Sequence, residues 1–276
     1  MQVDTVAKDL LFATVRLVTE AQDGEETSGT GFILDLELMK GESTPVLVTS
    51  RHVVEEATEV SLHLAVAGRD SDVQLRSALQ VRMVNGREAF FYHPDDSIDI
   101  AIAPIGRVIR DAPERLFYRA LPASLVPDAD ALDALDAIEE LIFVGYPDGR
   151  WDSINQTPTT RRGITATPVW LDYDGRPYFL IDGGVFPGSS GSPVLIYNTG
   201  GFAVGGSFAI GQRMMLVGVL TDSLIRNQSV NFGDLGGSFE QGLGLGTVLN
   251  ARALVHTIDL FCANAGLTRT PRTPGA

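Results

Sequence analysis

Three serines lie close together in the stretch GVFPGSSGSPV, residues 184–194, shortly after the apolar run YFLID. Glycine, serine and proline are the ordinary residues of turns, so a flexible turn is the first interpretation of this stretch. A serine becomes a nucleophile only where a base takes its proton, an acid orients that base and N–H donors stabilise the oxyanion. The rest of the chain decides between these two interpretations.

The chain has four histidines, which limits the candidates for the base. His52 lies in VLVTSRHVVEEA, where an apolar strand gives way to polar residues, and a site residue at the rim of a barrel is expected at such a point. His63 alternates within an apolar run, His93 lies in the loop YHPDD, and His256 falls in the last helical segment. We expect these three histidines to be structural and His52 to be the base.

Three aspartates in DDSIDIAIAPI are candidates for the acid that orients the histidine. Asp99 leads directly into an alternating apolar run, and a carboxylate at the start of a buried strand needs a partner. Asp95 and Asp96 have the setting of ordinary loop carboxylates. Asp99 is therefore the predicted orienting acid.

Most of the sequence divides into apolar or alternating runs of roughly four to eight residues, which is typical of strands. These runs include FATVRLV, GTGFILDL, PVLVTS, EVSLHLAV, LIFVGYP, TPVWL and MMLVGVL. No long helical period alternates with them, as a βαβ protein requires. The pattern predicts a mostly antiparallel β architecture.

Two segments depart from the strand pattern. Between about residues 121 and 141, Asp130, Asp133 and Asp136 recur at helical spacing, which indicates a short solvated helix that connects two halves rather than a calcium loop. After Asn250, an expected N-cap, an apolar stripe predicts a terminal helix, formed by Leu254, Val255, Ile258, Phe261 and Cys262.

Composition excludes several classes of partner and cofactor. The 276 residues include 35 acidic and 21 basic side chains, and the net charge of -14 repels phosphate backbones and anionic lipid, so neither nucleic acid nor a membrane surface is an expected partner. Cys262 is the single cysteine, so no intramolecular disulfide forms, and no cluster has zinc-ligand spacing. No metal or other cofactor is expected. The N-terminal stretch lacks the pattern of a secretory signal, which favours a cytoplasmic location.

The order His52, Asp99 and then a serine in GSSGSP is the order of the chymotrypsin triad. Together with SGTGFIL, LVTSRHVV, DIAIAPI, FVGYPDG and PGSSGSPV, over about residues 11–249, it resembles the trypsin-like peptidase family in its bacterial, disulfide-free form. The resemblance implies an all-β fold of two antiparallel six-stranded barrels with a C-terminal helix. The expected divisions are a His- and Asp-bearing barrel over 1–122, a connection over 123–140, a Ser-bearing barrel over 141–249, a helix over 250–268 and a flexible tail over 269–276.

On the family's Gly-x-Ser-Gly-x-Pro pattern, Ser190 is the nucleophile, and the resemblance implies that the N–H groups of Gly188 and Ser190 form the oxyanion hole. Glycine suits position 188 because an N–H turned towards the substrate often needs a backbone conformation that a Cβ disfavours. An α/β-hydrolase elbow needs glycine where Ser192 stands and an acid after the serine, so that alternative fails.

Two departures from the family bear on activation and specificity. Ser189 replaces the aspartate with which a newly cut N-terminus pairs in digestive relatives. At the family's pocket-base position Gly184 leaves no carboxylate to select lysine or arginine, so uncharged side chains are slightly favoured. The remaining expected pocket residues are Thr221, Asp222 and Ser223, of which Thr221 is also a candidate to position Asp99.

The expected function is that of a serine endopeptidase that hydrolyses peptide bonds through an acyl-enzyme. Its partners would be a protein or peptide substrate and, because no N-terminal ion pair can order the nucleophile loop, an activating protein in some circumstances. The alternative from another class is a protease-shaped module that binds peptides or proteins with little or no turnover.

Overall fold

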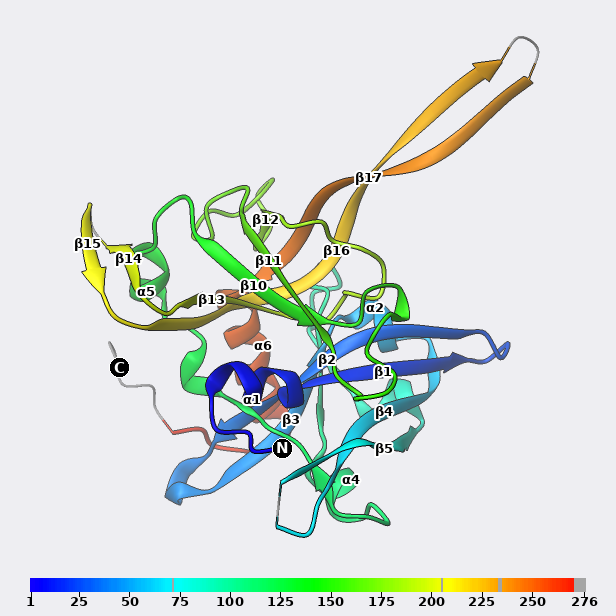
Figure 1. Ribbon diagram of the computed structural model, residues 1–276, viewed down its shortest axis with the longest axis vertical. Helices are drawn as coiled ribbons and strands as arrows, with labels where there is room; N and C mark the ends of the chain where they lie inside the picture. Colours follow the sequence, from blue (N-terminus) through cyan, green and yellow to red (C-terminus); the bar gives the residue numbers. More distant parts are fainter. Residues whose placement is uncertain (71, 205, 233–234, 271–276) are drawn as a thin grey trace.

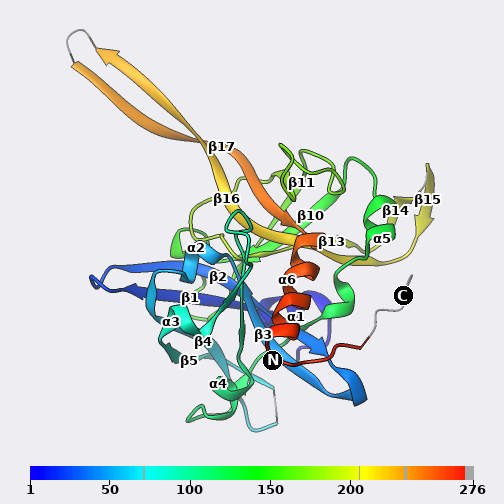
Figure 2. The same cartoon turned by 180° about the vertical axis from the view of Figure 1, so that it is seen from behind.

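The computed structural model describes residues 1–70, 72–204, 206–232 and 235–270. Two β-rich halves pack against each other, and the C-terminal helix lies between them (Figures 1 and 2). One continuous core joins the halves, since buried apolar residues of both contact the same helix. Among the helices of the described residues, none is long and apolar enough to cross a membrane.

The N-terminal half is a mainly antiparallel sheet with the strand order β5-β4-β1-β2-β3-β7-β6, on which β8 pairs with β4 and β9 with β2. Alternating apolar residues of the central strands are buried on both faces, which explains the strong strand signal of this part of the sequence. The strands are β1 (Thr14–Ala21), β2 (Glu26–Glu37), β3 (Ser43–Thr49), β4 (Ala57–Ala67), β5 (Val73–Val84), β6 (Phe91–Tyr92), β7 (Ala101–Pro104), β8 (Leu116–Phe117) and β9 (Leu121–Pro122).

This sheet is open, and the expectation of a second closed barrel is not met. Closure would require hydrogen bonds between the two outer strands, β5 and β6. β5 has 12 residues, whereas β6 has two and its neighbour β7 has four. Strands this short leave most of the long β5 edge without a ladder partner, so the sheet ends there.

The C-terminal half is a closed antiparallel barrel in the order β10-β11-β12-β17-β16-β13. Phe143 and Phe179 are fully buried among its inward-facing side chains. The strands are β10 (Glu140–Gly145), β11 (Thr159–Thr165), β12 (Tyr178–Asp182), β13 (Pro193–Asn198), β16 (Arg213–Phe232) and β17 (Leu235–Asn250). β16 and β17 continue beyond the barrel as a long two-stranded arm that stands out from the body (Figure 1).

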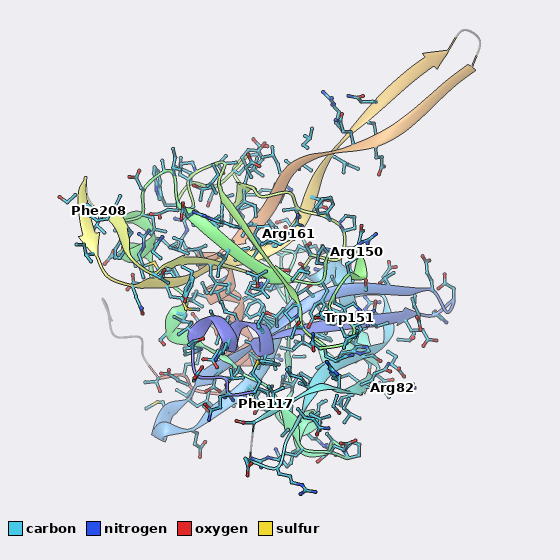
Figure 3. All side chains as sticks on the ribbon, in the orientation of Figure 1. Arg82, Phe117, Arg150, Trp151, Arg161 and Phe208 are labelled. Atoms are coloured by element: carbon cyan, nitrogen blue, oxygen red, sulfur yellow. The ribbon has the colours of Figure 1, made fainter. Side chains whose placement is uncertain are left out.

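A smaller hairpin of β14 (Gly201–Val204) and β15 (Ser207–Ile210) projects from the other end of the barrel, with Phe208 exposed at its outer side (Figure 3). The remaining elements are short. They are α1 (Val6–Ala13), α2 (Arg51–Val54), α3 (Gly86–Ala89), α4 (Gly106–Arg110), α5 (Ala129–Asp133) and the 3-10 turns η1 (Met39–Gly41), η2 (Ala123–Leu125) and η3 (Pro147–Gly149).

One of the predicted strands is a turn, and another begins two residues later than predicted. The run FATVRLV forms β1 from Thr14 onward, and its first two residues end α1, a helix that Thr5 caps through the N–H of Lys8. The run TPVWL forms a turn in which Val169 is buried and the Trp170 indole donates to the Leu135 carbonyl. Both runs contain buried apolar residues, and burial alone does not distinguish a strand from a helix or a turn.

The predicted terminal helix is confirmed as α6 (Ala251–Asn264). Asn250 is its N-cap, since the side-chain oxygen accepts from the Ala253 N–H at 3.1 Å. The predicted stripe faces the core, and Val255 alone among its members is half-buried; the buried members are Leu254, Ile258, Phe261 and Cys262. Most of the tail expected over 269–276 lies outside the described residues.

Candidate active site

His52 and Asp99 come together because two neighbouring strands end beside each other. Thr49, the last residue of β3, pairs with Ala101, the first residue of β7. His52 lies three residues after the end of β3, in α2, and Asp99 two residues before the start of β7. The sheet therefore places both side chains at the same edge, as in any antiparallel pair whose ends meet.

The carboxylate of Asp99 accepts two hydrogen bonds from His52. The distance from His52 Nδ1 to Asp99 Oδ2 is 2.7 Å, and the His52 backbone N–H donates to Asp99 Oδ1 at 3.0 Å. An ionised carboxylate only accepts, so Nδ1 carries the proton and Nε2 is left as the acceptor. This is the tautomer that a general base for a serine needs.

The environment of His52 raises its pKa above the ordinary value for histidine. Partial burial disfavours the imidazolium and lowers the pKa, but the hydrogen bond to Asp99 and its charge outweigh burial. The carboxylates of Asp222 and Glu55 raise the pKa further through their charges. The site therefore stabilises a protonated His52, the state that follows proton transfer from a nucleophile.

Tyr178 of the barrel holds the backbone at the predicted acid and two residues before it. Its hydroxyl accepts from the Asp99 N–H at 2.9 Å and donates to the Ser97 carbonyl at 2.8 Å. Tyr178 was not predicted as a site residue, because the run YFLID has only the pattern of a buried strand. The hydroxyl of Thr221, by contrast, donates to the Thr247 carbonyl at 3.0 Å, so it does not position Asp99 by donating to it.

Backbone hydrogen bonds to β2 and β16 fix the loop that carries the three serines. The Ser190 carbonyl accepts from the Thr30 N–H at 2.9 Å, and the Gly191 N–H donates to the Leu220 carbonyl at 2.7 Å. Gly191 has a φ of 88°, and a Cβ there would lie 1.9 Å from the Thr30 carbonyl oxygen. Glycine is therefore required for this close approach.

The Leu220 carbonyl also brings the two halves of the candidate site together. It accepts from the buried Ser50 hydroxyl at 3.2 Å as well as from the Gly191 N–H. Ser50 is two residues from His52, and Gly191 is next to Ser190. A single backbone group thus connects the loop of the predicted base with that of the predicted nucleophile.

The three serines differ in accessibility. Ser189 and Ser192 are buried, and their hydroxyl oxygens have no hydrogen-bond partner among the described residues. Ser190 is only half-buried, so its hydroxyl is the most accessible of the three. In the described part of the chain no hydrogen bond joins Ser190 to His52, and such contacts are often long in a free enzyme.

The peptide before Gly188 is oriented by a hydrogen bond to Asp148. Gly188 has a φ of 80°, and the preceding Pro187 carbonyl accepts from the Asp148 N–H at 2.5 Å. A trans peptide directs its N–H opposite to its carbonyl, so the Gly188 N–H faces away from Asp148. Within residues 1–70, 72–204, 206–232 and 235–270, neither this N–H nor that of Ser190 donates to another protein group.

The expected pocket residues lie together at the base of the arm. The Gly184 N–H donates to the Gly244 carbonyl at 3.0 Å, Thr221 contacts Thr247, and Ser223 pairs with Gly246. Asp222, between Thr221 and Ser223, is exposed. The hairpin of β16 and β17 thus brings Gly184, Thr221, Asp222 and Ser223 to one side of the barrel, close to the serine loop.

The other histidines and aspartates lie outside this arrangement. His93 Nε2 is 3.0 Å from His256 Nδ1, and His93 Nδ1 accepts from the Asp95 N–H. His63 is partly buried on β4, and Asp96 accepts from Arg51. Across the described ranges, no three histidine, cysteine or acidic side chains converge as metal ligands.

One family model and several solved structures are similar to this chain. The family model described as trypsin-like peptidase domain matches residues 29–205, more than half of the chain. The HtrA-type protease AlgW, solved with a tripeptide, is 16% identical to this chain with a TM-score of 0.49. The match covers 95% of this chain and 63% of AlgW. An inactive mutant form of Rv3671c from M. tuberculosis H37Rv is 17% identical with a TM-score of 0.46, and 94% of this chain covers 90% of it.

This chain therefore spans less than two thirds of the length of AlgW. No protein among the curated sequences matches it. The family model, by contrast, covers the serine loop, the expected acid and the expected base in one continuous match. The chain belongs to the trypsin-like peptidase family.

Proposed function

We propose that this protein is a serine endopeptidase in which Ser190 attacks the peptide carbonyl, His52 is the general base and Asp99 orients His52. The observation that carries the proposal is the 2.7 Å contact between His52 Nδ1 and Asp99 Oδ2. The Leu220 carbonyl accepts hydrogen bonds both from Ser50, two residues before His52, and from Gly191 of the serine loop. Ser190 is the accessible serine of that loop.

The chemistry follows the two stages of acyl transfer. His52 Nε2 takes the proton of the Ser190 hydroxyl as its oxygen bonds to the carbonyl carbon, and the imidazolium then gives that proton to the leaving amine. Asp99 remains ionised and stabilises the imidazolium. In the second stage His52 Nε2 takes a proton from a water molecule as the water oxygen bonds to the acyl carbon. The imidazolium then gives that proton to the Ser190 oxygen as the acyl group leaves.

The oxyanion of each tetrahedral intermediate would lie against the N–H groups of Gly188 and Ser190. Both N–H groups lack a protein acceptor within the described ranges, so they are available without breaking an existing hydrogen bond. One such donor contributes roughly 10² to 10³ in rate, which makes the backbone of this loop nearly as important as the side chains.

Labelling with a fluorophosphonate tests the proposal directly, because this reagent needs an activated serine. We expect one covalent adduct, mapped to Ser190 by peptide mass spectrometry, and no adduct in Ser190→Ala. Ser189→Ala is the matched control and should label at the native rate. A folded protein that binds peptides but shows no adduct would contradict the proposal and support the binding module instead.

A further inference from the structure

Arg161 places a cation without a counter-ion beneath the serine loop. It lies on β11 opposite Phe143 of β10, in the barrel half of the molecule (Figure 3). Its guanidinium carbon is 5.7 Å from the ring centre of Phe143 and 4.6 Å from that of Phe186. Phe186 belongs to the serine loop, where its carbonyl accepts from the Ser189 N–H.

The polar contacts of this guanidinium are incomplete. Nη1 is buried and has no hydrogen-bond partner among the described residues, and Arg161 forms no ion pair with any carboxylate of these residues. Burial lowers its pKa, with no acidic neighbour to oppose that effect. Arginine stays charged, so this half-buried cation has no anion beside it among the described residues, and its buried Nη1 is left unsatisfied. The two aromatic rings offset only part of the cost of this unsatisfied group.

Gly184 of the expected pocket lies next to this cation. A Cβ on Gly184 would lie 3.2 Å from Arg161 Nη2, so the missing side chain leaves room directly over the guanidinium. Gly184 has a φ of 59°, a conformation that glycine adopts more readily than other residues. Asp222, the acidic member of the expected pocket, is exposed and forms no ion pair among the described residues.

We propose that Arg161 determines the specificity of this pocket, which accepts the carboxylate of an aspartate or glutamate side chain at the cleaved bond. The inference rests on the proposed function and adds its substrate class. A guanidinium binds a carboxylate through charge-assisted hydrogen bonds, and Nη2 of Arg161 faces the position that a Cβ on Gly184 would fill. The acidic residue is the one that contributes the carbonyl group, because that residue becomes attached to Ser190.

The test uses fluorogenic peptides that are identical except for the residue before the cleaved bond, which is Glu, Asp, Gln, Leu or Lys. We expect kcat/KM for the better of Glu and Asp to exceed that for Gln by at least about tenfold, as a charge-assisted contact implies. The Glu and Asp arms show which chain length fits. Arg161→Gln should abolish the advantage, and Arg161→Lys should keep part of it.

Arg162→Gln is the matched control, because this neighbouring arginine is exposed and paired with Glu140. It should leave the preference unchanged. Fluorophosphonate labelling at Ser190 should be native in Arg162→Gln, and the Arg161→Gln protein must still label at Ser190, which shows that its catalytic site is intact. Labelling at Ser190 together with a preference for Leu, Gln or Lys would overturn the role of Arg161 while leaving the proposed peptidase function in place.

Binding to the Ser190→Ala protein extends the test to a protein without turnover. The same peptides, carrying a fluorophore, are titrated and followed by anisotropy. Tighter binding of the acidic peptide than of its Gln counterpart, lost on adding Arg161→Gln, supports the inference. Equal affinity for the two peptides overturns it.

Discussion

The open sheet and the closed barrel hold their parts of the candidate site in different ways. In the sheet, His52 and Asp99 contact each other directly, at the paired ends of β3 and β7. In the barrel, Ser190 lies on a loop whose carbonyl groups are bound by Thr30 of the other half. The predicted base and acid thus contact each other within one half, and Tyr178 of the barrel holds the Asp99 backbone. The position of the predicted nucleophile depends on the docking of both halves.

Thr30 of the open sheet makes three hydrogen bonds to the barrel half. Its N–H donates to the Ser190 carbonyl, and its hydroxyl donates to the Gly188 carbonyl at 2.9 Å and accepts from the Tyr146 N–H at 3.0 Å. It is fully buried, so water cannot replace these bonds. We therefore expect changes in the barrel loop to affect Ser190 alone. Changes at Thr30 should alter the position of Ser190 relative to His52.

The largest effect is expected for Ser190→Ala, which removes the nucleophile without changing a core volume. We expect kcat to fall by roughly 10⁵ to 10⁶, measured with a peptide that the native protein cleaves, while the melting temperature stays close to native. Ser192→Ala is the control and should keep most of the activity, since its buried hydroxyl has no partner among the described residues. Activity that survives in Ser190→Ala but not in Ser189→Ala would move the nucleophile by one residue.

Asp99→Asn should have the next largest effect, about 10⁴ in kcat, because an amide stabilises the wrong tautomer of His52 and cannot stabilise its imidazolium. Asp95→Asn and Asp96→Asn should retain most activity, since neither carboxylate contacts the His52 ring. Steady-state kinetics of the three variants under one condition provides the measurement. Similar losses at all three positions would remove the special role of Asp99.

The sequence predicts the two parts of the site unequally. His52 and Asp99 each lie at a visible change from apolar to polar residues, and that change marks where paired strands end. Thr30 and Tyr178 carry no such signal, because their partners Gly188 and Asp99 lie 158 and 79 residues away in the sequence. Their roles come from tertiary contacts, which local patterns do not contain.

The parts of the fold are also predicted unequally by the sequence. The expectation of the closed barrel came with the family resemblance, whereas α6 follows from a regular apolar stripe. The open sheet was not predicted, because closure depends on how far β6 and β7 extend, and element boundaries are the weakest part of sequence-based reasoning. The unpaired state of Arg161 is likewise invisible in a sequence rich in carboxylates.

Thr30→Val tests the docking of the two halves with an intermediate effect. Valine keeps the shape but leaves the Gly188 carbonyl and the Tyr146 N–H without a partner, at about 1–3 kcal/mol for each buried group. We expect kcat/KM to fall by roughly 10 to 100-fold, with the pKa of His52, followed by NMR, unchanged. A shifted His52 pKa in Thr30→Val would show that the two parts of the site are not independent.

The pH profile gives a smaller and more specific effect. His52 must be neutral to act as a base, and its raised pKa places the rise of kcat/KM above the ordinary histidine range near pH 6.5. Asp222→Asn removes one of the charges that raise this pKa, so the rise should move to lower pH. Asp174→Asn, an exposed change on the barrel, is the control and should leave the profile in place. A shift to higher pH in Asp222→Asn would contradict the electrostatic account.

The smallest effect is expected from shortening the arm. Gly218↔Asn250, Val219↔Leu249 and Leu220↔Val248 pair within the barrel, whereas the arm continues beyond the pair Ile225↔Gly242. Replacing residues 226–241 by Asn-Gly joins Ile225 to Gly242 through a two-residue hairpin turn, which suits adjacent antiparallel strands. Because the serine loop contacts β16 at Leu220, below the arm, fluorophosphonate labelling of Ser190 should stay within about twofold of native, as neither the loop nor its contacts change. A tenfold slower labelling rate would show that the arm supports the barrel side of the site. The position of Ser190 would then depend on more than the contacts of its loop with Thr30 and Leu220.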